Sequence, residues 1–485
     1  MKRDIKMQFL MLLAALSCVL VLPACGESQL PPEPEEGVLI YAALNPVDEK
    51  TEISVKKFND AHEDVQIEIR DYSDEGGIER LRTELVLGRV PDIMEMHYYG
   101  KSGPKVAVGH KYYVVPGAYA ESEDEYWMPY RQMAQKGYLE DLWPYIENDP
   151  KLGRDGVLQP PLEAAEVNGG LYILFQKFCI FTLIGRESVV GDRYSWTLDE
   201  LMEAFAAMPE GSTIMRYSMT KRDVFFNLLC PSLEQFVDRN TGECSFDSKT
   251  FRDLVLLLEG FPDEAVEEDP AAAEQEVRYR IEEGLQMLEG KMVDWQRDIG
   301  FSDAIWGERA AFPGTPTSDG SSGGYFYAPK TILSMSSTCR NKDAAWEYIR
   351  ELVAPQRNSL EPITISMNIP VNRADYEWLI RGELKQQSDG LQLSPEIFEQ
   401  PDIPIFEEQH FTFGRPIHLL TPLTAEDSQR HRDLIDHTNR LYWPNGELSD
   451  IVWEVLGTYF AGDLTLDLAV ERIQNRVGLY LNEQK

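Results

Sequence analysis

The residue of this chain with the most sharply defined chemistry is Cys25. Residues 9–22 are apolar throughout, basic residues precede them, and Cys25 follows between the small residues Ala24 and Gly26. This arrangement is typical of a bacterial lipoprotein signal, which is cleaved before the cysteine so that its thiol can carry a lipid. The apolar segment is shorter than the roughly 20 residues that a membrane-spanning helix needs. We therefore predict that residues 1–24 are a cleaved signal peptide and that Cys25 is lipidated.

The segment that begins at Cys25 is predicted to be a tether. Residues 25–37 are rich in proline and glutamate and have too few apolar side chains to form a core. In an extended form, at ~3.1 Å per residue, this segment would hold a globular body ~30 Å from the bilayer. The sequence thus predicts a protein on the extracellular face of the cell membrane, anchored by its N-terminal lipid.

Patterns typical of catalysis are weak in this chain. Its seven histidines form no His-Glu-x-x-His motif and no evident zinc-binding spacing, and no Walker A sequence is present. Residues 320–324 match the Gly-x-Ser-x-Gly pattern of a nucleophile elbow, but they lack the flanking strand and helix, which favours a flexible loop. We predict no catalytic residue, no metal and no cofactor.

The cysteines outside the signal are predicted to be structural. Cys179, Cys230, Cys244 and Cys339 match neither a metal knuckle nor a Cys-x-x-Cys redox motif. An exported protein can form disulfides, and Cys230 is close enough to Cys244 in sequence for such a pair. We favour four buried thiols over this alternative.

Length and charge limit the class of protein. A chain of 485 residues with 43% hydrophobic composition exceeds what one core usually supports, so two lobes are expected. The net charge of −36 argues against nucleic-acid binding, because neutralising phosphates requires a basic surface. The acidic surface is sufficient to keep an exported protein soluble.

The elements that would position a site alternate between strand and helix after residue 38. Ile53, Phe58 and Ala61 are expected to face inward from the first helix. Such an alternation predicts a parallel, doubly wound sheet, whose ligands bind beyond the carboxyl ends of its strands. Strands are expected at residues 38–44, 65–69 and 91–96, and helices at residues 53–61 and 78–86.

This topology selects polar and aromatic residues at strand ends. Asn45 follows the first strand, and Tyr98 and Tyr99 follow the third. The carboxyl ends of parallel strands meet at one edge, so we expect these side chains to line a common crevice. Further along the chain, the apolar run at residues 171–184 is expected to be a strand or a crossover segment.

Short motifs, in their order after the signal, resemble the extracellular solute-binding proteins of family 1, the sugar-binding class that supplies ABC importers. The resemblance covers most of the mature chain, and the shared order of the motifs carries it. The motifs occupy residues 88–93, 137–142, 195–201, 312–316, 319–320, 344–349, 369–373, 474–477 and 480–483.

The resemblance implies an α/β, two-lobed fold like that of the periplasmic binding proteins of type II. The ligand is then held in a cleft between lobes joined by hinge crossings, and ligand contacts with both lobes favour the closed state. We expect lobe one at residues 38–175 plus 324–368, and lobe two at residues 176–323 plus 369–485.

A sugar ring presents a flat C–H face and a fringe of hydroxyls, so its site needs aromatic planes together with acids or amides. Trp295 is the strongest candidate, because family members often carry a stacking aromatic just after the equivalent Gly-Lys strand. Its alternative role is that of a core tryptophan. The candidate ligand-binding residues are Asn45, Asp92, Tyr98, Tyr99, Phe175, Trp295, Trp306, Tyr325 and Tyr327.

The resemblance predicts a monomeric substrate-binding protein that captures a carbohydrate, expected to be an oligosaccharide, and delivers it to an ABC permease. A cell-surface glycoside hydrolase is the alternative, because some of the 82 acidic residues could form a carboxylate pair across a cleft. A binding protein for a non-sugar solute, or one that serves signalling, is a further alternative.

Overall fold

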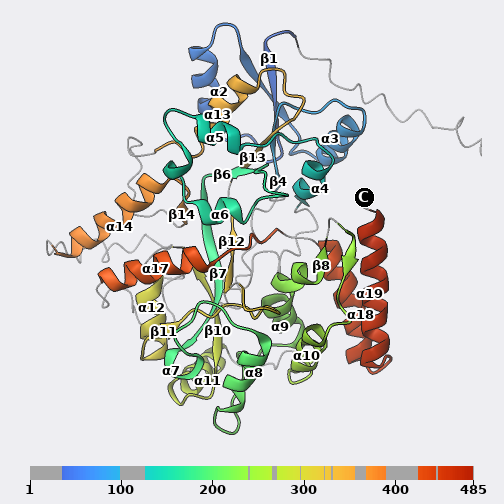
Figure 1. Cartoon of the computed structure of the whole chain (residues 1–485), viewed down its shortest axis with the longest axis vertical. Helices are drawn as coiled ribbons and strands as arrows, with labels where there is room; N and C mark the ends of the chain where they lie inside the picture. The colour runs from blue at the N-terminus through green and yellow to red at the C-terminus, as the bar shows by residue number, and fades with distance from the viewer. Residues whose placement is uncertain are drawn as a thin grey trace, which may run out of the picture.

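The computed structural model describes residues 35–98, 126–238, 241–264, 270–294, 297–321, 323–328, 331–355, 368–388, 424–443 and 446–483. These residues form two α/β lobes stacked along the long axis of the molecule (Figure 1). The predicted signal peptide, the lipidated Cys25 and all but the last three residues of the tether lie outside the described residues.

Lobe one is built on a five-stranded mixed sheet. Its parallel part is the predicted strand and helix alternation, in which β1 pairs with both β2 and β3. All of β1 beyond its first residue is buried, as expected for a strand covered on both faces. The strand order is β2 (Gln66–Asp71), β1 (Val38–Ala43), β3 (Ile93–Glu95), β13 (Ile332–Met335) and β6 (Leu174–Phe175), with helices α2 (Glu49–Ala61), α3 (Gly77–Val86) and α13 (Lys342–Arg350).

The inward face of α2 differs from the prediction. Phe58 is buried as expected, but Ile53 is 58% exposed and Ala61 is exposed. Val55 and Phe58 lie three positions apart on the same helical face and pack into the core. The prediction for Ile53 and Ala61 was wrong because helical spacing alone does not say which of two apolar faces the sheet will cover.

Lobe two is built around one long strand, β7 (Lys177–Arg186), to which every neighbouring strand is antiparallel. Figure 1 shows β7 running from the middle of the molecule down through the lower lobe. Its partners are β10 (Leu288–Val293), β11 (Ala310–Ala311), β12 (Gly324–Tyr327) and β14 (Ile369–Pro370).

Helices cover the sheet of lobe two and complete a second core. A capping box formed by Thr197 and Glu200 begins α8. The other elements are β4 (His97–Tyr98), β5 (Tyr126–Trp127), α4 (Tyr130–Gln135), α5 (Trp143–Asn148), η1 (Arg154–Gly156), α6 (Gln159–Glu163), α7 (Glu187–Val190), α8 (Leu198–Ala206), α9 (Lys221–Val224), η2 (Phe225–Leu229), η3 (Cys230–Phe236), β8 (Val237–Asp238), β9 (Glu243–Cys244), α10 (Lys249–Leu258), α11 (Pro270–Glu282), α12 (Arg297–Trp306), α14 (Arg373–Ser388), α17 (Ala425–His437), α18 (Gly446–Phe460) and α19 (Leu466–Glu483).

The chain crosses between the two sheets more than once. The apolar run at residues 171–184 makes the first crossing, because β6 belongs to the sheet of lobe one and β7 to that of lobe two. The predicted boundary at residue 324 needs correction: β12 pairs with β7, so the return crossing falls between Tyr327 and Ile332. Strand pairing of this kind has no local signal in the sequence.

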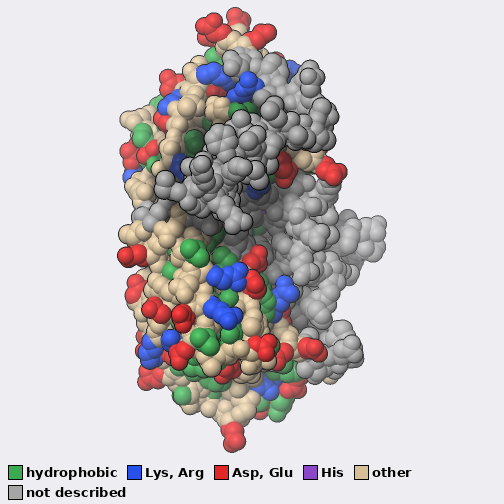
Figure 2. Space-filling view, turned by 90° about the vertical axis from the view of Figure 1, so that its right-hand side faces the viewer, with side chains coloured by type: hydrophobic (Ala, Val, Ile, Leu, Met, Phe, Trp, Pro, Cys, Tyr) green, Lys and Arg blue, Asp and Glu red, His purple; other side chains and the backbone are tan. Residues whose placement is uncertain are grey.

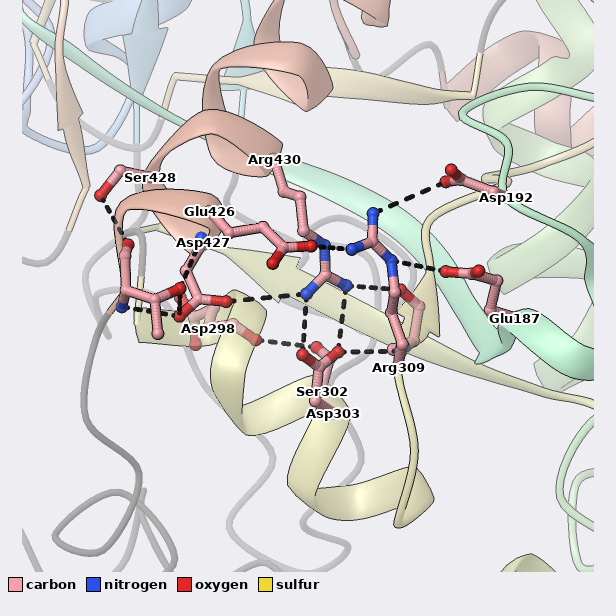
Figure 3. A network of polar contacts seen from close by, with 12 residues as sticks. Glu187, Asp192, Asp298, Ser302, Asp303, Arg309, Glu426, Asp427, Ser428 and Arg430 are labelled. Atoms are coloured by element: carbon pink, nitrogen blue, oxygen red, sulfur yellow. Dashed lines mark hydrogen bonds and ion pairs between the residues drawn. The ribbon is translucent and has the colours of Figure 1, made fainter.

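A network of ion pairs joins the helices on one side of lobe two (Figure 3). Arg430 on α17 donates to both carboxylate oxygens of Asp303 on α12, at 2.7 and 3.0 Å, and to the carbonyl of Ala310 at 2.6 Å. Arg309 pairs with Glu187 and with Glu426. The network holds α12 and α17 against β11 and α7, and every charge named here has a partner.

His431 on α17 provides a pH-dependent contribution to stability. Its imidazole is buried, with Nδ1 2.9 Å from the hydroxyl of Tyr376, and burial lowers the pKa of His431 from 6.5 to about 4. Asp298 acts in the opposite direction, and Arg432 reinforces the lowering. As the pH falls below 6.5, the unfolded chain binds a proton that the folded protein does not, so stability is lost.

We expect the His431 imidazole to lower the free energy of unfolding by about 2 kcal/mol when the pH falls from 7 to 5. The variant His431→Gln should therefore lose about 2 kcal/mol less than the wild type over that interval, measured by urea unfolding at both pH values. His437→Gln on the same helix is the matched control, because His437 is exposed. An unchanged pH dependence in His431→Gln would contradict the assignment.

The cysteines of the body are free. Cys179 and Cys339 are buried as predicted, whereas Cys230 and Cys244 are half-buried, and none of the four is in a disulfide. Acidic side chains are spread over the face seen in Figure 2, in keeping with the net charge of −36. Within the described ranges, no helix combines the length and apolar character needed to cross a membrane.

Candidate functional site

Four aromatic rings form one face of the lobe-two sheet, at the end of β7 nearest the crossings. We call Phe181, Tyr325, Tyr327 and Tyr442 the aromatic face. Phe181 stacks on Tyr325, with ring centroids 5.6 Å apart and planes 14° apart, and Tyr442 lies 5.4 Å from Tyr325. Tyr327 meets Phe181 edge-on at 5.9 Å. The structure thus brings the predicted Tyr325 and Tyr327 together with two rings that were not predicted.

Strand alternation explains why these rings share a face. Phe181 and Tyr325 are register partners, and successive side chains along each strand point to opposite sides of the sheet. Phe178 and Phe326 therefore point to the other side and join the large core. The segment around Leu441 runs beside β12: the amide of Phe326 donates to the carbonyl of Arg440 at 2.7 Å, and the amide of Tyr442 donates to that of Phe326 at 2.8 Å.

A cation lies at the edge of the aromatic face. Because Leu441 pairs with Phe326, the alternation turns Arg440 and Tyr442 toward the aromatic side. Nη2 of Arg440 donates to the hydroxyl of Thr315 at 3.0 Å. Burial lowers the pKa of Arg440 to about 10, with Tyr325 acting in the opposite direction, so the guanidinium is still charged at neutral pH.

An acid lies at the end of β10. Alternation places Asp294 on the same side as Met292, which packs against the aromatic face. The amide of Asp294 donates to Asp298 at 3.0 Å, and Asp298 pairs with Lys291 at 3.0 Å. Burial, followed by the neighbouring Asp298 carboxylate, raises the pKa of Asp294 well above its usual range. A carboxyl group with a raised pKa can keep its proton and donate a hydrogen bond.

Lobe one contributes the strand ends that the topology predicted. Asn45 follows β1 and is half-buried, and its Nδ2 donates to Glu95 at 3.1 Å and to the carbonyl of His97 at 2.7 Å. Glu95 also accepts hydrogen bonds from the Tyr41 hydroxyl at 2.7 Å and the Leu44 amide at 2.8 Å. Burial raises the pKa of Glu95, and these hydrogen bonds oppose the rise. Asn45 is thus oriented by a buried carboxyl group.

The remaining candidates on the loops are only partly described. The backbone of Tyr98 lies in β4, next to Asn45's partner His97 and paired with β5. Tyr99 and Trp295 lie outside the described residues, although Trp295 directly follows Asp294 in the sequence. Asn45, Tyr98, Tyr99 and Trp295 therefore stay predictions.

Asp92 has a structural position. It precedes β3, whereas the predicted crevice lies beyond the carboxyl end of that strand. Its carboxylate accepts hydrogen bonds from the amides of Ile40 at 2.8 Å and Arg340 at 3.0 Å, and it forms an ion pair with the guanidinium of Arg340. Because both oxygens are engaged, we leave Asp92 out of the ligand site.

Phe175 and Trp306 also lie away from the aromatic face. Phe175 is 1% exposed and pairs with Ile332 across the strands β6 and β13, inside the large core. Trp306, at the end of α12, is 1% exposed in the same core. Their side chains fill space between elements, so we leave them out of the ligand site as well.

The sequence reasoning missed several residues of this region. Phe181 could have been found from the alternation of side chains along β7, which places it on the same side of the strand as Cys179. Asp294 could have been found from its position just before Trp295. Arg440, Tyr442 and Glu95 had no local signal, because pairing with distant strands positions them.

The region around the aromatic face gathers groups that can form hydrogen bonds with a polar ligand. It combines aromatic rings with a cation at Arg440 and a carboxyl group at Asp294. In the part of the chain that the structure describes, no group of three or more His, Cys, Asp or Glu side chains is placed to hold a metal ion.

Comparison with known proteins gives similarity in structure only. No protein-family model matches the sequence, and no curated protein matches it. Solved structures similar to the chain include an extracellular solute-binding protein of family 1 from Alicyclobacillus acidocaldarius, with 14% identity over 92% of this chain and 98% of the other, at a TM-score of 0.45.

Two further structures show the same range of similarity. The sugar-binding protein MalE from Xanthomonas citri has 13% identity over 92% of this chain and 98% of the other, at a TM-score of 0.48. An ABC substrate-binding protein from Listeria monocytogenes, solved with cycloalternan, has 12% identity over 92% and 100%, at a TM-score of 0.44.

Proposed function

We propose that the protein is a lipid-anchored extracellular substrate-binding protein that captures a carbohydrate between its two lobes. The aromatic face is the observation that carries this proposal. Phe181, Tyr325 and Tyr327 are buried in this structure, so opening of the lobes would have to uncover these stacked and edge-on rings before they offer flat apolar surfaces to the C–H face of a sugar ring. Asp294, Arg440 and, from lobe one, Asn45 would bind its hydroxyl groups.

The position of the aromatic face near the crossings supports capture by closure. Tyr327 and Phe181 belong to strands that lead directly into the crossings between the sheets. The neighbouring Trp443 donates from its indole to the carbonyl of Met128 at 3.1 Å, which brings this segment against lobe one. A ligand that contacts both lobes would favour the closed state by its differential contacts.

Delivery to an ABC permease completes the proposal. It requires closure, docking and release by a monomer, with no covalent chemistry, so no catalytic residue or cofactor is invoked. Tyr98, Tyr99 and Trp295 are proposed as further contacts with the ligand, and the crossings between the two lobes as the hinges of closure. An oligosaccharide is the proposed substrate, since the aromatic face offers several rings rather than one.

Thermal unfolding of the purified full chain against a panel of mono- and oligosaccharides tests this proposal. A ligand at about a hundred times its dissociation constant adds about 2.7 kcal/mol to stability, so a bound sugar should raise the midpoint visibly. The sugars recovered afterwards should be intact. Hydrolysis products would identify a glycoside hydrolase instead. If no sugar of the panel shifts the midpoint, the proposal that the ligand is a carbohydrate is wrong.

A further inference from the structure

Arg440 is a half-buried cation whose hydrogen-bonding capacity is mostly unused. Its Nη2 donates to Thr315 at 3.0 Å, but Nε and Nη1 are buried and have no hydrogen-bond partner among the described residues. In the described ranges Arg440 forms no ion pair, and the carboxylate that acts on it electrostatically, Asp319, accepts its own hydrogen bond from the amide of Ser321 at 3.0 Å.

The two arginines of the described ranges that are buried as whole residues, Arg350 and Arg430, are neutralised. Arg430 has both oxygens of Asp303 at 2.7 and 3.0 Å. Arg350 has Asp149 at 3.1 Å. Burying a charged group without a partner is costly, and leaving its donors without acceptors adds to the cost. The contrast indicates that an acceptor for Arg440 comes from outside the fold.

The location of Arg440 identifies that acceptor's source. Arg440 and Tyr442 are turned to the same side of their strand, and Tyr325 contributes to the electrostatic environment of the guanidinium. A molecule stacked on the aromatic face would therefore bring its polar groups to Nε and Nη1 of Arg440.

We propose that the carbohydrate bound at the aromatic face carries an anionic group, a carboxylate or a sulfate, which accepts hydrogen bonds from Nε and Nη1 of Arg440. This inference rests on the proposed carbohydrate-binding function and narrows it to acidic sugars. Hydrogen bonds between a guanidinium and a carboxylate or sulfate are shorter and stronger than neutral ones, and here they form in a buried setting.

The acidic character of the protein does not oppose such a ligand. Charges on the surface are screened beyond roughly 8 Å at physiological ionic strength. Asp294, the acid on the aromatic side, has a raised pKa and is able to keep its proton. A protonated Asp294 would donate a hydrogen bond to the sugar without repelling its anionic group.

Binding of matched acidic and neutral trisaccharides to the full chain and to Arg440→Gln tests the inference. The probes are tri-galacturonate, its methyl ester, a sulfated trisaccharide and maltotriose, measured by calorimetry. We expect the wild type to bind an acidic probe, and Arg440→Gln to weaken that binding on the order of 10- to 100-fold. Binding of the neutral probes should change little. Preference between the carboxylate and the sulfate probe identifies the anion.

Two controls separate this role from a structural one. Arg472→Gln removes the same charge from an exposed position on α19 and should leave acidic binding unchanged. The thermal midpoint of Arg440→Gln without ligand should equal or exceed that of the wild type, because a half-buried cation without an ion-pair partner in the described ranges is removed. A large fall in that midpoint would mean that Arg440 is a structural residue.

Failure of this inference differs from failure of the proposed function. If the wild type binds maltotriose or the methyl ester but neither acidic probe, the anionic ligand is overturned and the sugar-binding function stands. Equal binding of an acidic probe by the wild type and Arg440→Gln also overturns it. If none of the sugars binds, the proposed function falls, and the inference falls with it.

Discussion

Replacing Tyr325 and Tyr442 together by alanine is expected to raise the dissociation constant for the bound carbohydrate on the order of 100-fold. Aromatic anchors in binding sites commonly cost 2 kcal/mol or more when truncated, and their rings provide stacking beyond buried area. These two rings lie 5.4 Å apart, and Tyr325 also stacks on Phe181. Their removal takes away most of the flat surface that the proposal assigns to the sugar.

Calorimetry with the sugar selected by the thermal panel measures this effect. Tyr279→Ala is the control, since Tyr279 is 52% exposed on α11. Tyr325 is itself buried, so circular dichroism must show that the double variant is folded. The single variant Tyr442→Ala, at a half-buried position, should weaken binding in the same direction. Wild-type affinity in both variants would remove the aromatic face from the ligand site.

Replacing Asp92 by alanine is expected to lower the free energy of unfolding by about 3 kcal/mol. The carboxylate accepts hydrogen bonds from the amides of Ile40 and Arg340 and pairs with the Arg340 guanidinium. Its loss would leave the Ile40 amide unpaired within β1, an interior strand of the sheet. We expect the lower end of the range for broken buried pairs, because the Arg340 side chain is 42% exposed.

Chemical unfolding of both proteins measures this effect, and a carbohydrate titration of the folded variant separates stability from binding. Asp60→Ala is the matched control, since Asp60 pairs with Lys56 at an exposed position and should cost less than about 1 kcal/mol. Sugar affinity should be unchanged in folded Asp92→Ala. A variant of normal stability that has lost its affinity would return Asp92 to the ligand site.

In the proposed site, both lobes contribute residues that contact the ligand. Lobe two supplies the rings and the cation, whereas lobe one supplies Asn45, oriented by the buried Glu95. Neither set alone surrounds a sugar, so closure completes the site. An anionic group on the ligand would also make the closed state depend on charge, because Arg440 has its neutralising partner only when the ligand is bound.

Much of lobe one could be predicted because its signals are local. The continuous apolar run of β1 indicates a strand buried on both faces, and the alternation of residues 65–69 indicates β2. The position of Asn45 beyond β1 followed from the rule for parallel sheets. Asp92 was included as an acid that could bind sugar hydroxyls, although it precedes β3 and lies at the opposite end of that strand from the predicted crevice.

The ligand-site candidates outside lobe one were harder to judge. Phe175, Trp306 and Tyr325 are all aromatic and all near glycines or strand ends, yet Phe175 and Trp306 fill the core. Composition and local spacing do not record which side of a strand faces a helix. Strand pairing decides which side of a strand faces a helix, and β7 pairs with segments up to about 190 residues away in the chain.

By itself, the sequence determined the local elements, the export signal expected before Cys25 and a resemblance to a class of two-lobed proteins. Those features depend on neighbouring residues, whose periodicity encodes helix, strand and burial. The tertiary structure alone decided that Phe181, Tyr325 and Tyr442 share a face with Arg440. Their strands are far apart in the chain, and the contacts that select their register form only when the hydrophobic core closes, because burial then distinguishes the two sides of each strand.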